Sequence, residues 1–481
     1  MKKFTLPAGS ALPLLVAGAM FMENLDTTVI VTALPKMAEA FGVHAIDLNI
    51  GVSAYILTLT VFIPASGWIA NRFGTRTVFS SAIILFTLAS ILCAMSVSLP
   101  TFTAARMLQG FAGALMVPVG RLVVLRNTAK ADLIRAIATI TWPALVAPIL
   151  GPPLGGFITT YASWHWIFLL NVPLGIAALL LSLKLIPNEK GATGIPFDIT
   201  GFVLTGIACF GLMFGLDMFN KGGSYLLPSL FVMGSLLVGV AAVRHSLVTP
   251  HPLLPMVAMK IKSYAVTVIG GSLFRIAIGS LPFLLPLLFQ LGYGMSPFDA
   301  GLLVLSVFAG NLAMKPFTSA ILFRFPFRSI LVVNGLINTL TIFACAFLTP
   351  AVPTALTFIL LFISGMSRSM QFTAINTLAF SQVPGPMMGG ANTMFNTAQQ
   401  LSSGLGIAIG ALALRIAQHF EPAVASGTSL GSFRLAFIIV GGIAILGMLD
   451  SMTLNATDGD EIRQKKKAAA KKDAQETTQP E

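Results

Sequence analysis

The chain is poor in charge, since only 10% of its 481 residues are Asp, Glu, Lys or Arg, whereas soluble domains carry about 25%. With 56% hydrophobic residues and a mean hydropathy of +0.87, it has more apolar surface than one globular core can bury. It has only three cysteines, each inside an apolar run, which excludes a disulfide framework and a Cys-x-x-Cys metal site. Soluble, fibrous, disordered and disulfide-rich classes are therefore excluded, and the composition predicts an all-α polytopic membrane protein.

Motifs for several kinds of chemistry are also missing. No Gly-x-x-x-x-Gly-Lys-Ser/Thr phosphate loop occurs, so nothing supports ATP-driven transport by this chain. The five histidines are scattered near the ends of apolar runs, without His-Glu-x-x-His spacing or an adjacent nucleophile. The 29 Lys and Arg do not gather on one segment, as they would in a nucleic-acid-binding domain. We therefore expect no enzyme activity, no metal or cofactor, and neither ATP nor nucleic acid as a partner.

Long apolar stretches fill most of the chain, and charged or Pro- and Gly-rich breaks divide them into fourteen. A helix of about 20 apolar residues crosses a bilayer, and the stretches lie near 11–33, 48–70, 77–99, 101–125, 133–160, 164–187, 199–219, 225–248, 264–290, 298–321, 329–349, 354–379, 390–414 and 433–453. The first is too long for the apolar core of a signal peptide, so we expect it to be retained as a span.

Positive charge alternates between the connections. Arg72 and Arg76 follow the second stretch, Arg121 and Arg126 lie at the end of the fourth, and a Lys-rich tail follows the last. Cytoplasmic loops carry an excess of Lys and Arg. The pattern therefore places both termini in the cytoplasm.

An internal repeat accompanies this alternation, because Arg-Phe-x-x-Arg occurs at 72–76 and again at 324–328, after the second and tenth stretches. Duplicated halves are typical of secondary transporters, whose substrate site lies between them near the midplane. The predicted organisation is an N-terminal six-helix half at 1–190, a two-helix insertion at 191–250, a C-terminal six-helix half at 251–455 and a disordered basic cytoplasmic tail at 456–481.

Ionisable residues inside apolar stretches are the first candidate functional groups: Glu23, Asp26, Arg106, Arg275 and Arg368. A central charge costs about 2.5–3.5 kcal/mol on insertion scales, so such positions are usually functional or paired. Glu23 and Asp26 share a helical face, and a buried carboxyl group beside a cation is poised between its neutral and ionised forms. We predict that Asp26, Glu23 and Arg106 couple transport to protons. The alternative is a buried ion pair that only joins helices.

Neutral polar residues at helical spacing suggest where a solute binds. Polar stripes inside a membrane either hydrogen-bond neighbouring helices or line a water-filled path. The predicted substrate cavity comprises Gln109, Arg275, Arg368, Gln371, Asn392 and Asn396. Because the two arginines of the second half have no obvious acid opposite them, the substrate could be anionic or zwitterionic as well as a cationic drug.

Four motifs, in the same order along the chain, resemble those of the fourteen-span drug:proton antiporters of the major facilitator superfamily. The segment at 25–35 resembles the first-span signature, the segment at 67–76 the loop motif, Arg106-x-x-Gln109-Gly110 the fourth-span motif, and Gly151-Pro152-x-x-Gly155-Gly156 the fifth-span antiporter motif. The resemblance covers the N-terminal half, and the second half matches through its span count and its loop repeat. The residues assigned to conformational motifs are Gly67, Asn71, Arg72, Gly74, Arg76, Gly151, Pro152, Gly155 and Gly156.

The resemblance implies a major facilitator fold of two six-helix halves plus two inserted central helices. It also implies a proton-driven exporter of an amphipathic small molecule, such as a drug, siderophore or organic acid, that works by alternating access in the inner membrane of a bacterium. In the family, the residue matching Asp26 is tied to proton coupling and that matching Arg106 to proton transfer. The motif at 151–156 is tied to antiport.

One departure leaves other functions open. Asn71 stands where the family's loop motif usually has an acidic residue, so the control exerted by that carboxylate is weakened or rerouted here. A proton-coupled importer of the same fold is one alternative. A membrane sensor or scaffold that no longer moves solute is the other, and the Asn71 departure favours it. The expected partners are a small-molecule substrate, protons and the lipid bilayer.

Overall fold

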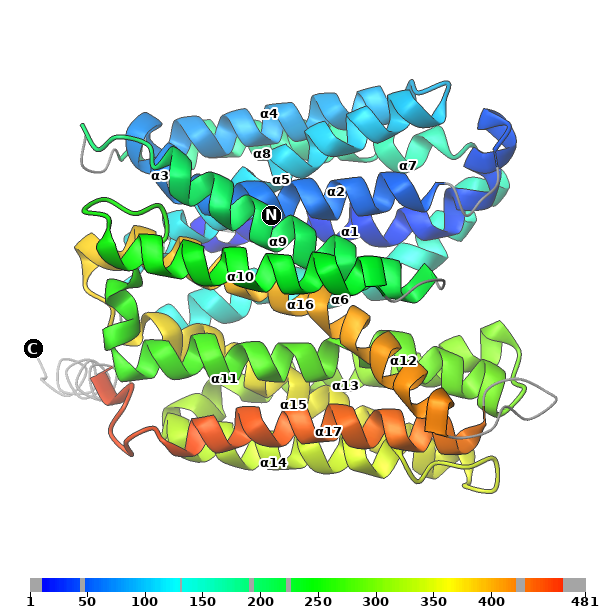
Figure 1. Cartoon of the computed structure of the whole chain (residues 1–481). Helices are drawn as coiled ribbons and strands as arrows, with labels where there is room; N and C mark the ends of the chain where they lie inside the picture. The colour runs from blue at the N-terminus through cyan, green and yellow to red at the C-terminus, as the bar shows by residue number, and fades with distance from the viewer. Residues whose placement is uncertain are drawn as a thin grey trace, which may run out of the picture.

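The computed structural model describes residues 11–43, 48–129, 132–189, 194–221, 226–420 and 429–461, and helices are its regular elements (Figure 1). The helices of the first half are α1 (Ala11–Phe41), α2 (Asn49–Phe62), η1 (Ile63–Ala65), α3 (Ser66–Phe73), α4 (Thr75–Ala94), α5 (Leu99–Asn127), α6 (Leu133–Tyr161), α7 (His165–Leu169) and α8 (Asn171–Leu185). They are followed by α9 (Ile199–Lys221) and α10 (Leu226–Val248). The second half contains η2 (Met256–Lys260), α11 (Lys262–Gly279), α12 (Leu281–Leu287), η3 (Leu288–Gly292), α13 (Pro297–Arg324), α14 (Phe327–Cys345), α15 (Thr354–Ser381), η4 (Gly385–Met387), α16 (Met388–Phe420) and α17 (Leu430–Met452).

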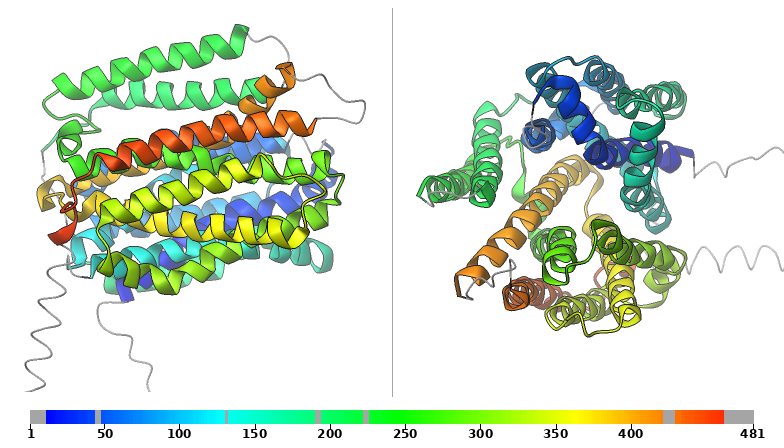
Figure 2. Two further views of the ribbon diagram at one scale, coloured as in Figure 1. Left: turned by 90° about the horizontal axis from the view of Figure 1, so that it is seen from below. Right: turned by 90° about the vertical axis from the view of Figure 1, so that its right-hand side faces the viewer.

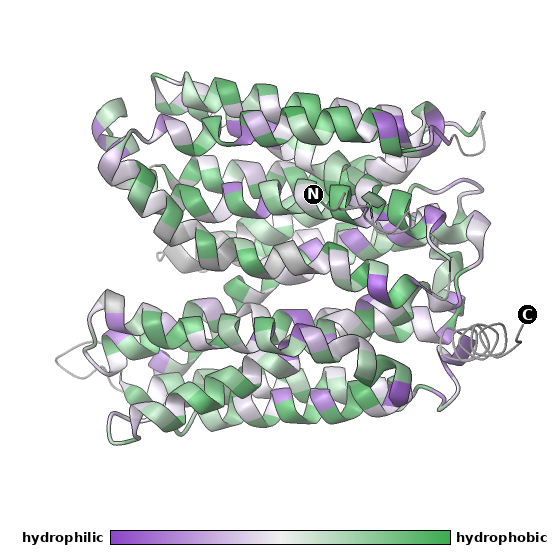
Figure 3. Cartoon of the chain, turned by 180° about the vertical axis from the view of Figure 1, so that it is seen from behind, coloured by the Kyte–Doolittle hydropathy of each residue, from purple (hydrophilic) through white to green (hydrophobic). Residues whose placement is uncertain are grey.

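Each predicted apolar stretch falls on one helix or on consecutive helical segments. In the described part of the chain, twelve segments are long and apolar enough to cross a membrane. The helices α1 and α6, of 31 and 29 residues, occupy the first and fifth predicted stretches. Most of the helical ribbon is hydrophobic, interrupted by single hydrophilic positions (Figure 3). The predicted multi-pass helical architecture is therefore confirmed, while the N-terminal lysines and the tail from 462 onward lie outside the described residues.

The helices form two bundles with a helix pair beside them (Figure 2). Helices α1–α8 pack with one another, and α11–α17 pack with one another. The α9–α10 pair lies at one side, where α9 contacts α2 of the first bundle and α16 of the second, while α10 packs on α9. Helix α16 runs obliquely between the bundles (Figures 1 and 2). The chain thus places its two bundles face to face, with α9 in contact with both.

Tight turns at one end of the molecule hold the two copies of the repeated loop. Helix α3 ends at Phe73 and α4 begins at Thr75, and likewise α13 ends at Arg324 and α14 begins at Phe327. We call this end, which also holds the start of α16, the motif end. Between α3 and α4, Gly74 has φ +94°, a left-handed conformation in which an L side chain is strained, and an added Cβ would also collide with Asn188.

Glycines bring α13 and α15 into direct backbone contact. A Cβ at Gly310 of α13 would overlap the backbone of Phe362, and a Cβ at Gly365 of α15 would overlap the backbone of Val307. Small residues that let two helices approach in this way are typical of membrane bundles, in which van der Waals packing replaces the hydrophobic effect. This crossing is one of the tightest structural constraints in the second bundle.

Candidate functional site

Asp26 is the centre of a buried polar cluster in the first bundle. It lies in the middle of α1 and is 2% exposed. Nη1 of Arg106 lies 2.6 Å from Oδ2 of Asp26, while the side-chain amides of Gln109 and Asn171 each donate to Oδ1 over 2.9 Å. The hydroxyl of Ser90 accepts hydrogen bonds from the same two amides, at 2.9 and 3.2 Å. The carboxylate therefore joins α1 to α5 and α8, and Ser90 adds α4 to the cluster through the two amides.

Arg106 is the only cation in this cluster among the described residues, and it is fully buried. Its Nη1 also donates to Oε1 of Gln109 over 2.6 Å, and its guanidinium lies over the Tyr55 ring, 4.4 Å from the centroid. Nε and Nη2 have no hydrogen-bond partner in the described part of the chain. The cation is thus stabilised by one carboxylate and one aromatic face, and a change at either alters its environment.

Glu23 lies one helical turn from Asp26, as the sequence predicts, and faces α2. The phenol of Tyr55 donates to Oε1 of Glu23 over 3.1 Å. The same Tyr55 ring lies under Arg106, which pairs with Asp26. Tyr55 and Arg106 therefore connect the two carboxyl groups. The glycines of α5 make this possible, since a Cβ at Gly113 would press on both Tyr55 and Glu23. The predicted proton-coupling trio therefore occurs as one contiguous group.

Three members of this group were missed by the sequence analysis: Tyr55, Ser90 and Asn171. Each is a single polar residue within an apolar stretch. Conversely, Gln109, predicted to line a substrate cavity, hydrogen-bonds Asp26 and is fully buried in this cluster. The structure therefore brings Gln109 to the carboxylate and not to the arginines of the second bundle.

A second group of cations, two of them buried and one half-buried, lies between the bundles. Phe395 of α16 has the Arg121 guanidinium 5.7 Å from its ring centroid and the Arg275 guanidinium at 4.8 Å. Phe372 of α15 has Arg275 at 6.0 Å and Arg368 at 5.7 Å. Arg121, which the charge pattern places among the loop cations, is buried within α5, where it is 5% exposed. Two predicted cavity residues, Arg275 and Arg368, therefore share a site with an arginine of the first bundle.

The remaining predicted cavity residues hydrogen-bond within the protein, two of them between helices. Asn392 donates to the carbonyl of Pro118 over 2.9 Å and so joins α16 to α5. Asn396 donates to Asn392, at 2.7 Å to its carbonyl and 3.0 Å to its side chain. Gln371 donates to the Leu331 carbonyl over 3.2 Å, which turns its amide toward α14. Asn392 and Gln371 therefore join neighbouring helices, whereas Asn396 supports Asn392 from within α16.

The loop motif lies against the second bundle at the motif end. A Cβ at Gly67 would overlap the side chain of Thr393 in α16, and a Cβ at Gly389 would contact both Asn71 and Arg126. Oδ1 of Asn71 accepts a hydrogen bond from Nη2 of Arg126 over 2.9 Å. The Asn71 amide therefore occupies the position where the family's loop motif usually has a carboxylate, and its partner there is the cation of Arg126. Of the other motif residues, Arg72 is exposed and Arg76 is half-buried.

Restoring an acid at this position is a direct test of the departure. In Asn71→Asp, the hydrogen bond from Arg126 becomes charge-assisted, which is about twice as strong as a neutral one. We expect the free energy of unfolding to rise by about 1 kcal/mol, measured by denaturation of the purified protein in detergent. The gain should vanish when Arg126 is replaced by Gln, and a gain that persists in that background would contradict the assigned pairing.

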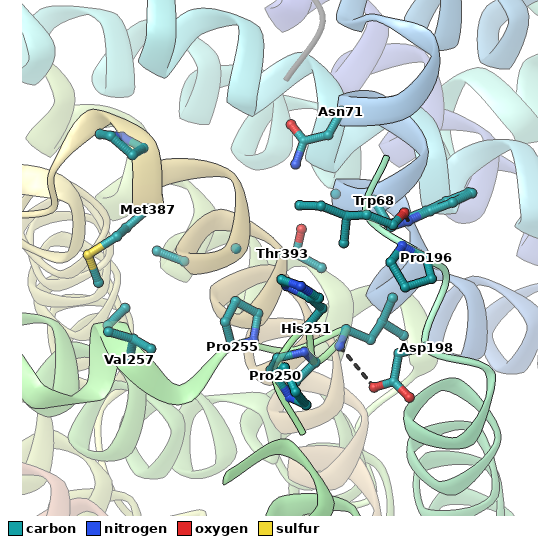
Figure 4. Close-up of a pocket in the computed structure, with 18 residues that line it drawn as sticks. Trp68, Asn71, Pro196, Asp198, Pro250, His251, Pro255, Val257, Met387 and Thr393 are labelled. Atoms are coloured by element: carbon teal, nitrogen blue, oxygen red, sulfur yellow. Dashed lines mark hydrogen bonds between the residues drawn. The ribbon is translucent and has the colours of Figure 1, made fainter. Parts of the chain in front are cut away.

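A pocket of about 310 Å³ opens where the loop motif, the segment before α9, the segment before α11 and the start of α16 meet (Figure 4). Trp68 lines it and donates from Nε1 to the Ile195 carbonyl over 3.1 Å. Asp198 accepts from Nε2 of His245 at 2.8 Å and from the Leu253 amide at 3.1 Å. Burial opposes ionisation of Asp198, but these bonds and the Gly201 amide outweigh it and hold the pKa of this carboxyl below its usual value. The ionised aspartate thus links the start of α9 to the end of α10 and to the segment that leads into the second bundle.

The antiporter motif faces α1. A Cβ at Gly151 would overlap Thr28, whose hydroxyl donates to the Ala147 carbonyl over 3.3 Å. Gly155 is buried, whereas a Cβ at Gly156 would meet nothing within 4 Å. Helix α6 is continuous through the motif, and the side chain of Pro152 lies outside the described residues. Gly151 therefore seats α6 against the helix that carries Asp26.

Comparisons with known proteins fit this geometry. The sequence model of the Major Facilitator Superfamily matches residues 16–407. The chain is 36% identical over 450 residues to the "Putative multidrug resistance protein MdtD" of Yersinia enterocolitica, covering 93% of this chain and 94% of the relative. It is 37% identical over 434 residues to the protein of that name from Serratia proteamaculans, covering 88% and 90%.

Solved structures share the fold. The human organic anion transporter MFSD10 superimposes with a TM-score of 0.67 at 14% identity, over 93% of this chain and all of that one. The proton:xylose symporter XylE gives a TM-score of 0.64 at 13% identity, over 92% and 94%. At such low identity these likenesses bear on the fold alone.

Proposed function

Because the chain belongs to the major facilitator superfamily, whose members are multi-pass membrane transporters, we propose that it is a proton-driven antiporter. It would export an amphipathic small molecule by alternating access from the inner membrane of a bacterium, with both termini in the cytoplasm. The names of its relatives support a drug or similar compound as cargo. The proposal thus combines a family assignment with a mechanism that depends on individual residues.

The observation that carries the proposal is the buried carboxylate of Asp26 facing Arg106. With Asp26 ionised, the pair is neutral overall, and its burial is tolerated because Gln109 and Asn171 add hydrogen bonds. A proton on Asp26 leaves the guanidinium as an uncompensated charge in a medium of low dielectric constant. That charge favours a conformation in which the cluster is hydrated. Proton binding can therefore drive a conformational change.

The arrangement of the two bundles supports alternating access. Side-chain contacts between them occur at the motif end, where Asn392 meets the Pro118 carbonyl, Arg121 meets Gln399 over 3.3 Å, and Gly67 meets Thr393. A state closed at this end is one of the two that the mechanism needs. Each charge that crosses a potential of 100 mV contributes about 2.3 kcal/mol, enough for one proton to support a concentration gradient of tens-fold.

Proton flux in everted membrane vesicles tests the proposal. Vesicles with this protein, acidified inside and carrying a pH-sensitive dye, are challenged with a panel of amphipathic cations, zwitterions and anions. A transported compound should release internal protons and accumulate in the vesicle, while vesicles without the protein stay unchanged. Net movement of a compound out of the vesicle together with protons would indicate an importer. Well-inserted protein that responds to no compound would overturn the proposal and favour a sensor or scaffold.

A further inference from the structure

We propose that Arg121, Arg275 and Arg368 form one binding site for an organic anion between the two bundles. The inference rests on the proposed function, because it names the chemical class of the exported substrate. It does not depend on how transport is energised, since the site would bind its anion at equilibrium with or without proton coupling.

The central member, Arg275, is buried without a polar partner. It is 1% exposed, and none of its three guanidinium nitrogens has a hydrogen-bond partner among the described residues. Nε of Arg368 likewise lacks a partner within those residues, and Arg121 donates from Nη1 to Gln399 over a long 3.3 Å. Arginine carries five N–H donors and is not deprotonated in proteins. The site therefore presents many unused donors that a bound acceptor could satisfy.

No acid in the described part of the chain neutralises these charges. The ion pairs there involve Lys36 with Glu39, Arg106 with Asp26, and His245 with Asp198. Asp450, the acid of α17, lies against Gly270, whereas Arg275 lies beside Gly271 on the other side of α11. A buried charge without a partner is strongly unfavourable. The buried Arg121 and Arg275, together with the half-buried Arg368, therefore point to a ligand as the source of the missing negative charge.

The aromatic rings define the shape of that ligand. Phe395 lies between Arg121 and Arg275, and Phe372 lies between Arg275 and Arg368. Cation–π contacts stabilise the ring faces of the guanidinium groups but leave their in-plane donors free, and the guanidinium fork matches carboxylate bidentately. A ligand with two or more acidic groups would use the forks of more than one arginine, and an apolar frame between those groups would lie against the edges of the rings. A cation would be repelled.

The position of the site connects binding with transport. Arg121 belongs to α5 of the first bundle, while Arg275 and Arg368 belong to α11 and α15 of the second. An anion held by all three would join the bundles, and separation of the bundles would pull its donors apart. The affinity for the anion would thus differ between the two states, as an exporter requires.

Equilibrium binding to the purified full chain in lipid nanodiscs tests the proposal. Naphthalene-2,6-dicarboxylate serves as the fluorescent probe, its dimethyl ester as the uncharged analogue, and 2-naphthyltrimethylammonium as the cation. We expect the dicarboxylate to bind at least tenfold more tightly than either analogue. Arg275→Gln should weaken its binding by about thirtyfold, since one partner of a buried charge pair is lost. Arg434→Gln is the matched control, because Arg434 also lies on a ring, that of Phe347, but is exposed.

Thermal unfolding shows whether a variant that fails to bind the probe is nevertheless folded. Without probe, Arg275→Gln should melt at or above the wild-type temperature, since an unpaired buried charge has been removed. With probe, the melting temperature should rise for wild type and for Arg434→Gln but not for Arg275→Gln. Equal binding of all three naphthalenes, or wild-type binding by Arg275→Gln, would overturn the anion site and leave proton-driven export standing. Specific binding without proton-linked movement would instead overturn the export mechanism and leave the site intact.

Discussion

Replacing Asp26 with Asn is expected to reduce proton-linked export to the level of vesicles without the protein. The amide keeps one oxygen that can accept from Arg106, so the contact between α1 and α5 is retained in outline. Its NH2 group then faces the donating amides of Gln109 and Asn171, and those two hydrogen bonds are lost. The amide cannot bind and release a proton in the physiological range. The transport cycle therefore loses the protonation step that gives it a direction. Proton release from everted vesicles measures the loss, and substrate-for-substrate exchange, which needs no net proton movement, should persist.

Loss of folding must be separated from loss of coupling in this variant. Breaking a buried ion pair by changing one partner costs about 3–5 kcal/mol, so insertion is checked by size-exclusion chromatography. The double variant Asp26→Asn with Arg106→Gln removes the leftover charge and should recover stability without recovering proton coupling. Glu39→Gln is the matched control, because Glu39 is an exposed acid of the same helix that pairs with Lys36 at 3.2 Å. Proton-linked export that survives in Asp26→Asn would move the coupling role to Glu23.

Replacing Gly310 with Val should strongly destabilise the packing of α13 against α15 in the second bundle. The new side chain would overlap the backbone of Phe362 in α15, which cannot move aside as the tip of a flexible side chain could. Overpacking of this kind costs typically about 1–3 kcal/mol and sometimes more. We expect a much smaller monodisperse fraction after purification and a melting temperature lower by several degrees.

A matched substitution in the same helix controls for the lower helix propensity of Val. A Cβ at Gly301, also in α13, meets nothing within 4 Å, so Gly301→Val should purify and melt nearly as wild type does. The reciprocal change, Gly365→Val, should reproduce the defect of Gly310→Val because its Cβ would meet the backbone of Val307. If Gly301→Val and Gly310→Val were equally affected, close approach of α13 and α15 would not be the cause.

The fold could be predicted to a large extent because the membrane restricts the choice of structure. A spanning segment must satisfy its backbone internally, so each apolar stretch had to be a helix. The charged site residues Asp26 and Arg106 were found for the same reason, since ionised groups are too costly in lipid to occur there without a partner or a function. Both predictions depend on penalties that the sequence itself reveals.

The parts that escaped prediction carry no such penalty. Asn171 and Ser90 are neutral and inexpensive to bury once hydrogen-bonded, so nothing distinguishes them from other polar residues in apolar stretches. Arg121 lies near the end of its stretch, where positive charge is usually explained by the cytoplasmic surface. Gln371 shows a further limit, because helical spacing gives the face on which a residue lies but not the neighbouring helix, here α14, that the face meets.

The α9–α10 pair makes the two flanks of the molecule mechanically unequal. On its flank, α9 contacts both α2 and α16. The side chain of Met213 in α9 occupies the space beside Gly404 of α16. In the proposed transport cycle, rotation of one bundle against the other would slide α16 along α9. On the opposite flank, α6 faces α13 directly, beside a hollow of about 600 Å³ lined by Phe21, Arg135 and Lys315. We therefore expect the bundles to part more widely at the α6–α13 flank, which no additional helix pair covers.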